Sequence, residues 1–365
     1  MTKKLLLAAA IAGCFAATAA SAADVTLYGV ADVGLRASRT EVDGVKTNKL
    51  EMMSGQNAGS RFGFKGAEDI NGMKVGFQLE AQYMVDTGAF KNSLLFHRQA
   101  TVYAQGQYGT LTFGRIGSFS SAAGTYDLFF GTGDSFDGGD GNVVGVFSYE
   151  SRRDNMVTYA SPDFAGFKVY AQYSFAQGTE NAQSGLNQRY MGLAATYNQG
   201  PLNVALTAET VHYANANDAQ DRQIDDKVVV GLAGNYNFGP VTVYAGAQYL
   251  KDGDNLANDW VSTSKFVTVD GYAAQIGAIA PALGGKFVVA AGYADGEANN
   301  LDGKLYDLTG YFGSVRYLYS FSKRTTVYAS VGYQQLERDA AAGQTLSAAA
   351  EEKLYQAAVG ITHKF

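Results

Sequence analysis

The stretch DVTLYGVADVGLRA, residues 24–37, alternates apolar and polar side chains over its whole length. Leu27, Val33 and Leu35 fall on one face, whereas Asp32 and Arg36 fall on the other. A period of two residues is that of a β-strand with one apolar and one polar side. The chain is therefore predicted to begin with a strand whose two faces meet different environments.

The same alternation recurs along the 365-residue chain, for example in residues 60–66, 73–85, 96–105 and 110–116. Proline interrupts strand ladders because it cannot donate a backbone hydrogen bond. The four prolines, at positions 162, 201, 240 and 281, lie 39, 39 and 41 residues apart, and two alternating segments fit into each interval. This spacing predicts hairpins with short turns at one end and longer polar loops at the other. It gives about sixteen strands, a number found among membrane barrels.

A soluble sandwich would hide the apolar faces of such strands between two sheets. A single closed barrel accounts better for so many consecutive strands, because closure leaves no unpaired edge in lipid. Its apolar face would meet lipid, and its polar face would line water. Aromatic residues gather near the predicted strand ends, as in the interfacial girdles of membrane proteins. We therefore expect an all-β fold, a sixteen-stranded antiparallel transmembrane β-barrel.

One long segment departs from the alternation. Residues 117–149 read GSFSSAAGTYDLFFGTGDSFDGGDGNVVGVFSY and contain four aspartates but no Lys, Arg or His. Structureless segments of this length are uncommon and are usually functional loops. The part DSFDGGDG lacks the ligand spacing of a calcium loop, since Phe136 stands where a ligand is needed. No metal site or cofactor is expected.

The N-terminus reads as a secretory signal peptide over residues 1–22, with Lys3 and Lys4, an apolar run and an A-x-A site at 20–22. A bacterial lipobox ending at Cys14 is the alternative. Loss of the two lysines changes the formal charge from −6 to −8, with 26 basic and 34 acidic residues, which argues against nucleic acid as a partner. Residues 23–365 are expected to form one domain.

Five stretches, read in order, resemble the trimeric general porins of Gram-negative outer membranes, in form closest to those of β-proteobacteria. The five are DVTLYGVADVGL (24–35), SRFGFKGAEDI (60–70), FHRQATVYAQGQYGTLTFGRIGSF (96–119), RRDNMVTYASPDFAGFKVYAQYSF (152–175) and AAVGITHKF (357–365). The resemblance implies a homotrimer in the outer membrane and a third external loop, residues 117–149, folded into the lumen. It implies outer-membrane lipid and lipopolysaccharide as surroundings, and passive diffusion of small hydrophilic solutes.

The resemblance also implies a constriction at which wall arginines face acids of the inward loop. The residues that match the basic wall are Arg61, Arg98, Arg115 and Arg152. Those that match the acidic loop are Asp127, Asp134 and Asp137. Alternation from Val157 and Tyr159 predicts that Arg152 points inward and Arg153 outward. The terminal Phe365 resembles the signal read by the barrel assembly machinery.

Three functions are compatible with a barrel of this kind. A general diffusion porin fits the residues best, and a solute-specific channel with a saturable site, for anions or dicarboxylates, is the alternative. A barrel adhesin or enzyme is the third. His97, His212 and His363 show no ligand spacing, and no nucleophile–base pattern or phosphate loop stands out. Enzymatic activity is therefore not expected.

Overall fold

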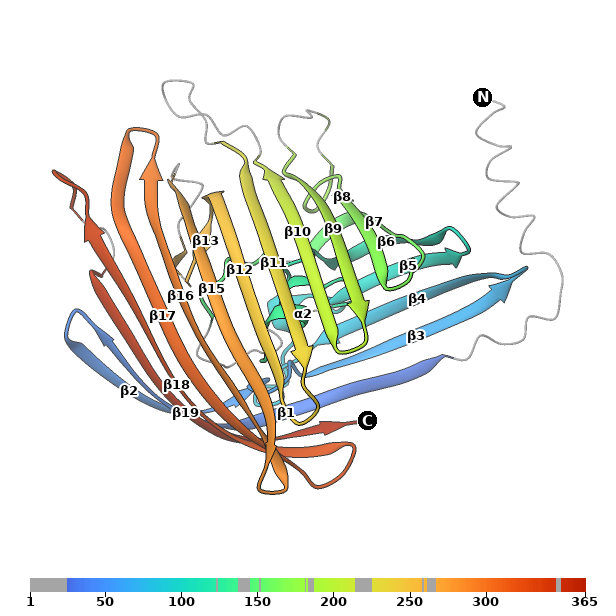
Figure 1. Ribbon diagram of the computed structural model, residues 1–365, viewed down its shortest axis with the longest axis horizontal. Coiled ribbons are helices and arrows are strands. Elements are labelled where there is room, and N and C mark those ends of the chain that lie inside the picture. The colour runs from blue at the N-terminus through green and yellow to red at the C-terminus, as the bar shows by residue number, and fades with distance from the viewer. Residues whose placement is uncertain are drawn as a thin grey trace.

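The computed structural model describes residues 25–122, 124–136, 145–150, 152–180, 182, 187–213, 225–257, 259–260, 267–345 and 349–365. The predicted signal peptide and Asp137 lie outside the described residues. The described strands form one curved, closed antiparallel wall, shown in Figure 1. No described helix is long and apolar enough to span a membrane.

The wall is built from the following strands: β1 (Thr26–Val42), β2 (Val45–Ser54), β3 (Arg61–Ile70), β4 (Met73–Gln82), β5 (Gln99–Gly106), β6 (Gly109–Gly117), β7 (Arg152–Ala160), β8 (Phe167–Ser174), β9 (Arg189–Gln199), β10 (Leu202–His212), β11 (Lys227–Asn237), β12 (Thr242–Gly253), β15 (Val267–Ala282), β16 (Gly285–Asn300), β17 (Gly303–Ser320), β18 (Thr325–Ala340) and β19 (Glu351–Lys364). The remaining elements are η1 (Lys91–Ser93), α2 (Phe129–Gly133), β13 (Asn255–Leu256) and β14 (Asp259–Trp260).

The predicted sixteen-stranded barrel is confirmed, with one irregularity that the sequence pattern did not reveal. Both β2 and β3 pair with β1, so they are two halves of one barrel strand interrupted at residues 55–60. With these halves counted together, the described wall has sixteen strands. Each pairs with its neighbour along the chain, and β1 pairs with β19 from Val30↔Lys364 to Val42↔Glu352. This last pairing closes the sheet.

The two ends of the barrel differ as predicted. One end of the barrel carries short turns, and β1 begins and β19 ends there. Three of these turns contain a proline, at positions 162, 201 and 240, and Pro281 lies beside the turn at 283–284. The opposite end carries the longer connections, although those at 43–44 and 301–302 are tight turns. Its third connection, between β6 and β7, is called loop 3 below (residues 118–151).

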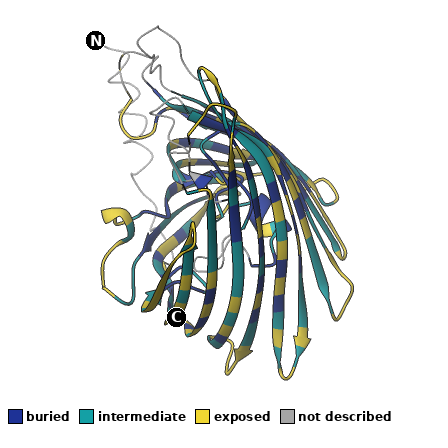
Figure 2. Ribbon diagram, turned by 90° about the vertical axis from the view of Figure 1, so that its left-hand side faces the viewer, coloured by how far each residue is buried: buried dark blue, intermediate teal, exposed yellow. Residues whose placement is uncertain are grey.

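The two faces of the wall also follow the alternation (Figure 2). Large apolar side chains remain exposed on the outside, for example Leu35, Val102, Leu193 and Ile276. Polar side chains such as Gln172, Thr207, Gln248 and Gln275 are buried on the inside. An apolar exterior around a polar interior is the arrangement expected when lipid is the outer solvent.

Aromatic rings form a band near each end of the barrel. Toward the long loops, Tyr249 stands opposite Tyr272, Tyr293 opposite Tyr311, and Tyr333 opposite Tyr355 on adjacent strands. Toward the short turns, the ring pairs are Tyr236–Phe238, Phe287–Tyr317 and Tyr319–Phe321. Amphipathic rings favour the headgroup level of a bilayer, so these bands mark the upper and lower limits of the apolar exterior.

Candidate functional site

Loop 3 packs against the inner face of the barrel. Its apolar side chains occupy places where the wall has glycine. A Cβ atom added to Gly231 would lie 2.6 Å from the ring of Phe129, and one added to Gly292 would lie 2.9 Å from Val146. Gly231 shares the inward face of β11 with the buried Val229 and Ala233, beside exposed outward neighbours. Glycine is therefore required here for close approach of the loop.

Polar contacts hold the same loop to the wall. Asn235 Nδ2 donates to the carbonyl of Thr132 at 2.8 Å, and Gln248 exchanges two hydrogen bonds with the backbone of Ser148 at 2.8 and 2.9 Å. Asp134, predicted as a constriction acid, accepts from Gln275 Nε2 at 2.7 Å. The described part of loop 3 thus packs along the inner wall from β9 to β17, and Thr125 also contacts Gln99 of β5 at 3.0 Å.

The tip of the described part of loop 3 meets Arg316 of β17. The guanidinium lies 4.9 Å from the centre of the Phe136 ring. It also donates to Asn57 Oδ1 at 3.1 Å and to the carbonyl of Gln56 at 2.9 Å. Arg316 therefore connects the loop tip to the interruption between β2 and β3.

Two of the predicted wall arginines share one carboxylate. Arg61 stands opposite Val30 and Gln82 in the sheet and belongs to the inward face. Its Nε lies 3.8 Å from Glu80 Oε2, while Arg98 Nε lies 2.5 Å from Glu80 Oε1. Arg98 precedes β5, so the alternation of that strand does not govern its direction. The wall here has two positive charges against one negative charge.

Arg115, another predicted wall arginine, pairs with a different carboxylate from that of Arg61 and Arg98. In the sheet Arg115 stands opposite Ala100, on the side of the exposed Val102 and Phe113, as the regular alternation of the β5–β6 ladder requires. Its guanidinium pairs with Asp154, and its Nε donates to the carbonyl of His97 at 2.9 Å. The sheet register therefore separates Arg115 from the inward-facing side chains.

Arg152 lies near the same histidine. Burial, together with the positive charges of Arg152 and Arg115, lowers the pKa of His97 to about 4. The imidazole is therefore neutral at physiological pH. His97 Nε2 lies 3.0 Å from the side-chain nitrogen of Asn92.

Arg153 departs from the predicted outward orientation. Its guanidinium lies 5.8 Å from the centre of the Tyr190 ring, which is fully buried on the inward face of β9, and it pairs with Glu150. The reason is a bulge in β7 between the pairs Gly114↔Met156 and Ile116↔Arg153, where Asn155 has φ of 51° and the alternation is interrupted. Glu150 also contacts Lys227 Nζ at 2.5 Å, so a buried ion network holds the base of loop 3.

The remaining predicted residues lie apart. Asp127 is half-buried at the start of loop 3, just after Tyr126, whose hydroxyl contacts Thr112 of β6 at 2.9 Å. At the chain end, Phe365 exchanges backbone hydrogen bonds of 3.0 Å with Gly29 of β1. Asp137 lies outside the described residues.

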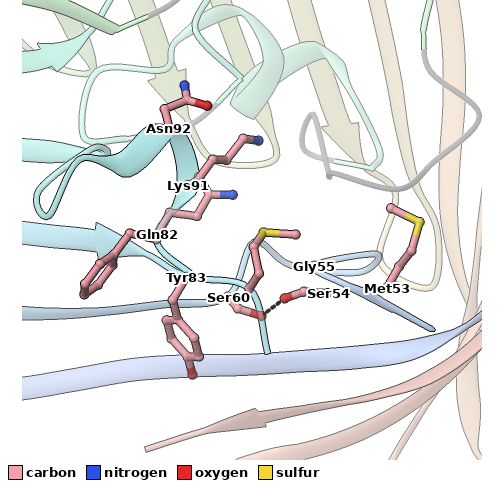
Figure 3. Close-up of a pocket in the computed structure, with 10 residues that line it drawn as sticks. Met53, Ser54, Gly55, Ser60, Gln82, Tyr83, Lys91 and Asn92 are labelled. Atoms are coloured by element: carbon pink, nitrogen blue, oxygen red, sulfur yellow. Dashed lines mark hydrogen bonds between the residues drawn. The ribbon is translucent and has the colours of Figure 1, made fainter. Parts of the chain in front are cut away.

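A cavity of about 380 Å³ lies beside the interruption of the second barrel strand (Figure 3). Met53 and Ser54 line one side, and Phe90, Lys91 and Asn92 of the connection between β4 and β5 line the other. Ser54 and Ser60 hydrogen-bond each other at 2.8 Å at its base. The cavity combines apolar side chains with one positive charge.

Several residues of the site were missed by the sequence analysis. Glu80 shares its alternation with Gln78 and Gln82, so the strand pattern had already placed it on the polar face. Nothing in the sequence linked it to Arg98, because the pairing depends on the neighbouring strand. The Glu150–Lys227 contact joins residues 77 positions apart (227 minus 150) and has no local signal.

Comparison with known proteins identifies similar chains over almost the whole length. A family model described as Gram-negative porin matches residues 7–339. An outer membrane porin protein of Bordetella pertussis is 30% identical over 410 residues, which cover 100% of both chains. The anion-selective porin from Comamonas acidovorans has a TM-score of 0.67 at 22% identity, over 94% of this chain and 100% of that one. The trimer form of OmpT from Vibrio cholerae has a TM-score of 0.59 at 18% identity, over 94% and 100% of the chains.

Proposed function

Because this chain belongs to the Gram-negative porin family, its barrel is an outer-membrane channel for passive diffusion of small hydrophilic solutes, and we propose that the passage narrows between loop 3 and the wall at Arg61 and Arg98. The family and its curated relatives are channels rather than enzymes. The described part of loop 3 packs on the inner wall from β9 to β17, whereas Arg61 begins β3 and Arg98 precedes β5.

The observation that carries this proposal is the shared carboxylate of Glu80. Arg61 and Arg98 together exceed it by one positive charge on a water-lined wall. On the loop, Asp134 is held by Gln275 and supplies an opposing negative charge. Opposed charges across a narrow neck produce a transverse field that orders water and polar solutes. We expect a weak preference for anions, with Asp127 and Asp137 moderating it from the loop.

The free edge of β2 supports a homotrimer. Among the described strands, only β1 pairs with β2. Residues Leu50 and Met52 are 74% and 57% exposed and lie below the level of Tyr355, which stands opposite Arg39. Lipid cannot satisfy unpaired backbone groups at this depth, so a second copy of the chain is proposed to cover the edge and the cavity beside it. Size measurement in detergent tests this assembly, and a folded monomer would contradict it.

The surroundings of the barrel follow from its two aromatic bands. The apolar exterior between them suits outer-membrane lipid, and lipopolysaccharide is the expected lipid at the long-loop end. The exposed ring of Phe365 at the chain end is proposed as the element that the barrel assembly machinery recognises.

Conductance of the purified full-length protein in planar bilayers tests the function. We expect stepwise openings in groups of three and a current that is linear in salt concentration. In a salt gradient, the reversal potential should be displaced weakly toward the equilibrium potential of the anion. Arg61→Gln should reduce that displacement by removing the surplus charge. Block by a single solute at micromolar concentration would instead favour the solute-specific channel, and absence of conductance would contradict both.

A further inference from the structure

A second long-end connection also folds into the lumen. The hairpin of β13 and β14, called the loop 6 hairpin below, lies between β12 and β15. Leu256 is 1% exposed and sits over two glycines of adjacent strands. A Cβ atom added to Gly271 or Gly296 would lie 2.6 or 2.8 Å from Leu256. Both glycines share the inward face with buried alanines, so the hairpin occupies the inside of the wall.

An ion pair fixes the hairpin in this position. Asp259 Oδ1 lies 2.8 Å from Arg338 Nη2, and its Oδ2 accepts from Arg338 Nε at 3.1 Å, so the pair is bidentate. The Tyr306 hydroxyl donates to the same Oδ2 at 3.0 Å. Bidentate arginine–carboxylate pairs fix orientation as well as distance. The hairpin is thereby attached to β17 and β18.

The loop 6 hairpin also contacts loop 3. The backbone N–H of Ala257 donates to the carbonyl of Val146 at 3.0 Å. The backbone N–H of Tyr149 donates to Asn255 Oδ1 at 3.2 Å. These contacts hold the part of loop 3 that returns from the constriction to β7, called the return arm below (residues 145–150). Asn255 and Ala257 are themselves buried, so these contacts lie in the interior.

We propose that the loop 6 hairpin is a positioning element of the channel, which holds the return arm of loop 3 and so fixes the width of the passage. The inference rests on the proposed function, since it concerns the same constriction. Gln248 already holds Ser148 of the return arm to the wall. Each further contact with a rigid element raises the free energy of opening of a segment, and the hairpin adds the contacts at Val146 and Tyr149. In a channel, such local openings of a loop appear as partial closures of the ionic current. Asp259 and Asn255 are therefore positioning residues that touch no solute.

Single-channel recording on the full-length protein tests the proposal. Asn255→Ala removes one direct contact with loop 3, and Asp259→Asn weakens the attachment of the hairpin to Arg338. Asn255→Ala should raise the frequency of partial closures by about tenfold, as expected for loss of one buried hydrogen bond. Asp259→Asn should raise it by at least as much, because it removes one charge of a buried pair. The fully open conductance should stay unchanged. Asp307→Asn is the matched control, because it removes the exposed ion pair between Asp307 and Lys304 on the same wall.

Thermal unfolding in detergent, followed by gel mobility, shows whether each variant still forms the barrel. If Asp259→Asn fails to assemble, Asn255→Ala alone decides the question. The inference would be overturned if folded Asn255→Ala showed the same frequency of partial closures as the parent. It would also be overturned if Asp307→Asn raised that frequency as much as Asn255→Ala does. If the parent chain itself does not conduct, the proposed function fails instead, so the two failures are distinguishable.

Discussion

Arg98 Nε lies 2.5 Å from Glu80 Oε1, and both side chains are only 9% exposed. The same carboxylate accepts a hydrogen bond of 3.0 Å from the Tyr28 hydroxyl and faces Arg61 at 3.8 Å. Removing one member of a buried ion pair leaves an uncompensated charge, which costs more than the pair contributes. Glu80 therefore both stabilises the wall and limits its positive charge.

Glu80→Gln should increase anion preference. The substitution keeps the size of the side chain and raises the surplus charge at Arg61 and Arg98 from one to two. We expect the reversal potential in a salt gradient to move toward that of the anion, and thermal stability to fall by roughly 3 kcal/mol. Glu41→Gln is the control, since Glu41 stands opposite Lys46 beside the tight turn at 43–44. An unchanged reversal potential in Glu80→Gln would show that the Arg98–Glu80 pair lies outside the constriction.

Removing the negative charges of loop 3 should likewise increase anion preference. Asp134→Asn keeps an oxygen that can accept from Gln275 and from the backbone of Phe136, so the loop should retain its shape. The loss of negative charge should raise anion preference, and Asp127→Asn should add to it. Reversal potentials of the single and double variants measure both effects. If all of them match the parent, the described loop acids lie outside the narrowest point.

Acid should release the base of loop 3 only at very low pH. Burial opposes the charge of Glu150, but Lys227 and Arg153 outweigh it and lower the pKa of Glu150 to about 2. Because the folded pKa lies below the ordinary value, the stabilisation is complete above that value and disappears as pH falls through about 2. The difference corresponds to on the order of 3 kcal/mol. Channel closures and unfolding temperature should therefore be constant from pH 7 to about 5 and change below about 4.

Glu150→Gln provides the comparison for that pH series. It leaves Arg153 and Lys227 without their shared carboxylate, so the variant should be less stable at pH 7. Its stability should then change less with acid than that of the parent. Parallel pH curves for the two proteins would show that another group governs the response.

The barrel could be predicted from sequence because one physical rule governs most of the chain. Lipid outside and water inside require alternation along every strand, and this periodicity is local enough to read. The same rule placed Arg61 correctly on the inward face, since β3 is regular there. Turns were equally readable, because proline and glycine mark them directly.

Local irregularity and contacts between distant residues set the limit of prediction. Asn155 has φ of 51° in the bulge of β7, and this bulge shifts the alternation before Arg153. Asparagine also occurs in regular strands, so the sequence alone does not predict the bulge. The loop 6 hairpin is short and lacks periodicity, and its inward position depends on glycines of β15 and β16. The free edge of β2 likewise appears only once the strands are paired.

Phe365 offers a test that separates a packing role from a recognition role. Its ring lies over Gly29, where an added Cβ would be 2.6 Å from Cε2, yet the residue is still 48% exposed. Gly29→Ala should displace the ring and cost about 1–3 kcal/mol of thermal stability, without slowing insertion. Phe365→Ala should instead slow insertion, because recognition by the assembly machinery precedes folding. Pulse-labelling with heat-modifiable gel mobility measures both rates, and equal slowing by the two substitutions would assign Phe365 to packing alone.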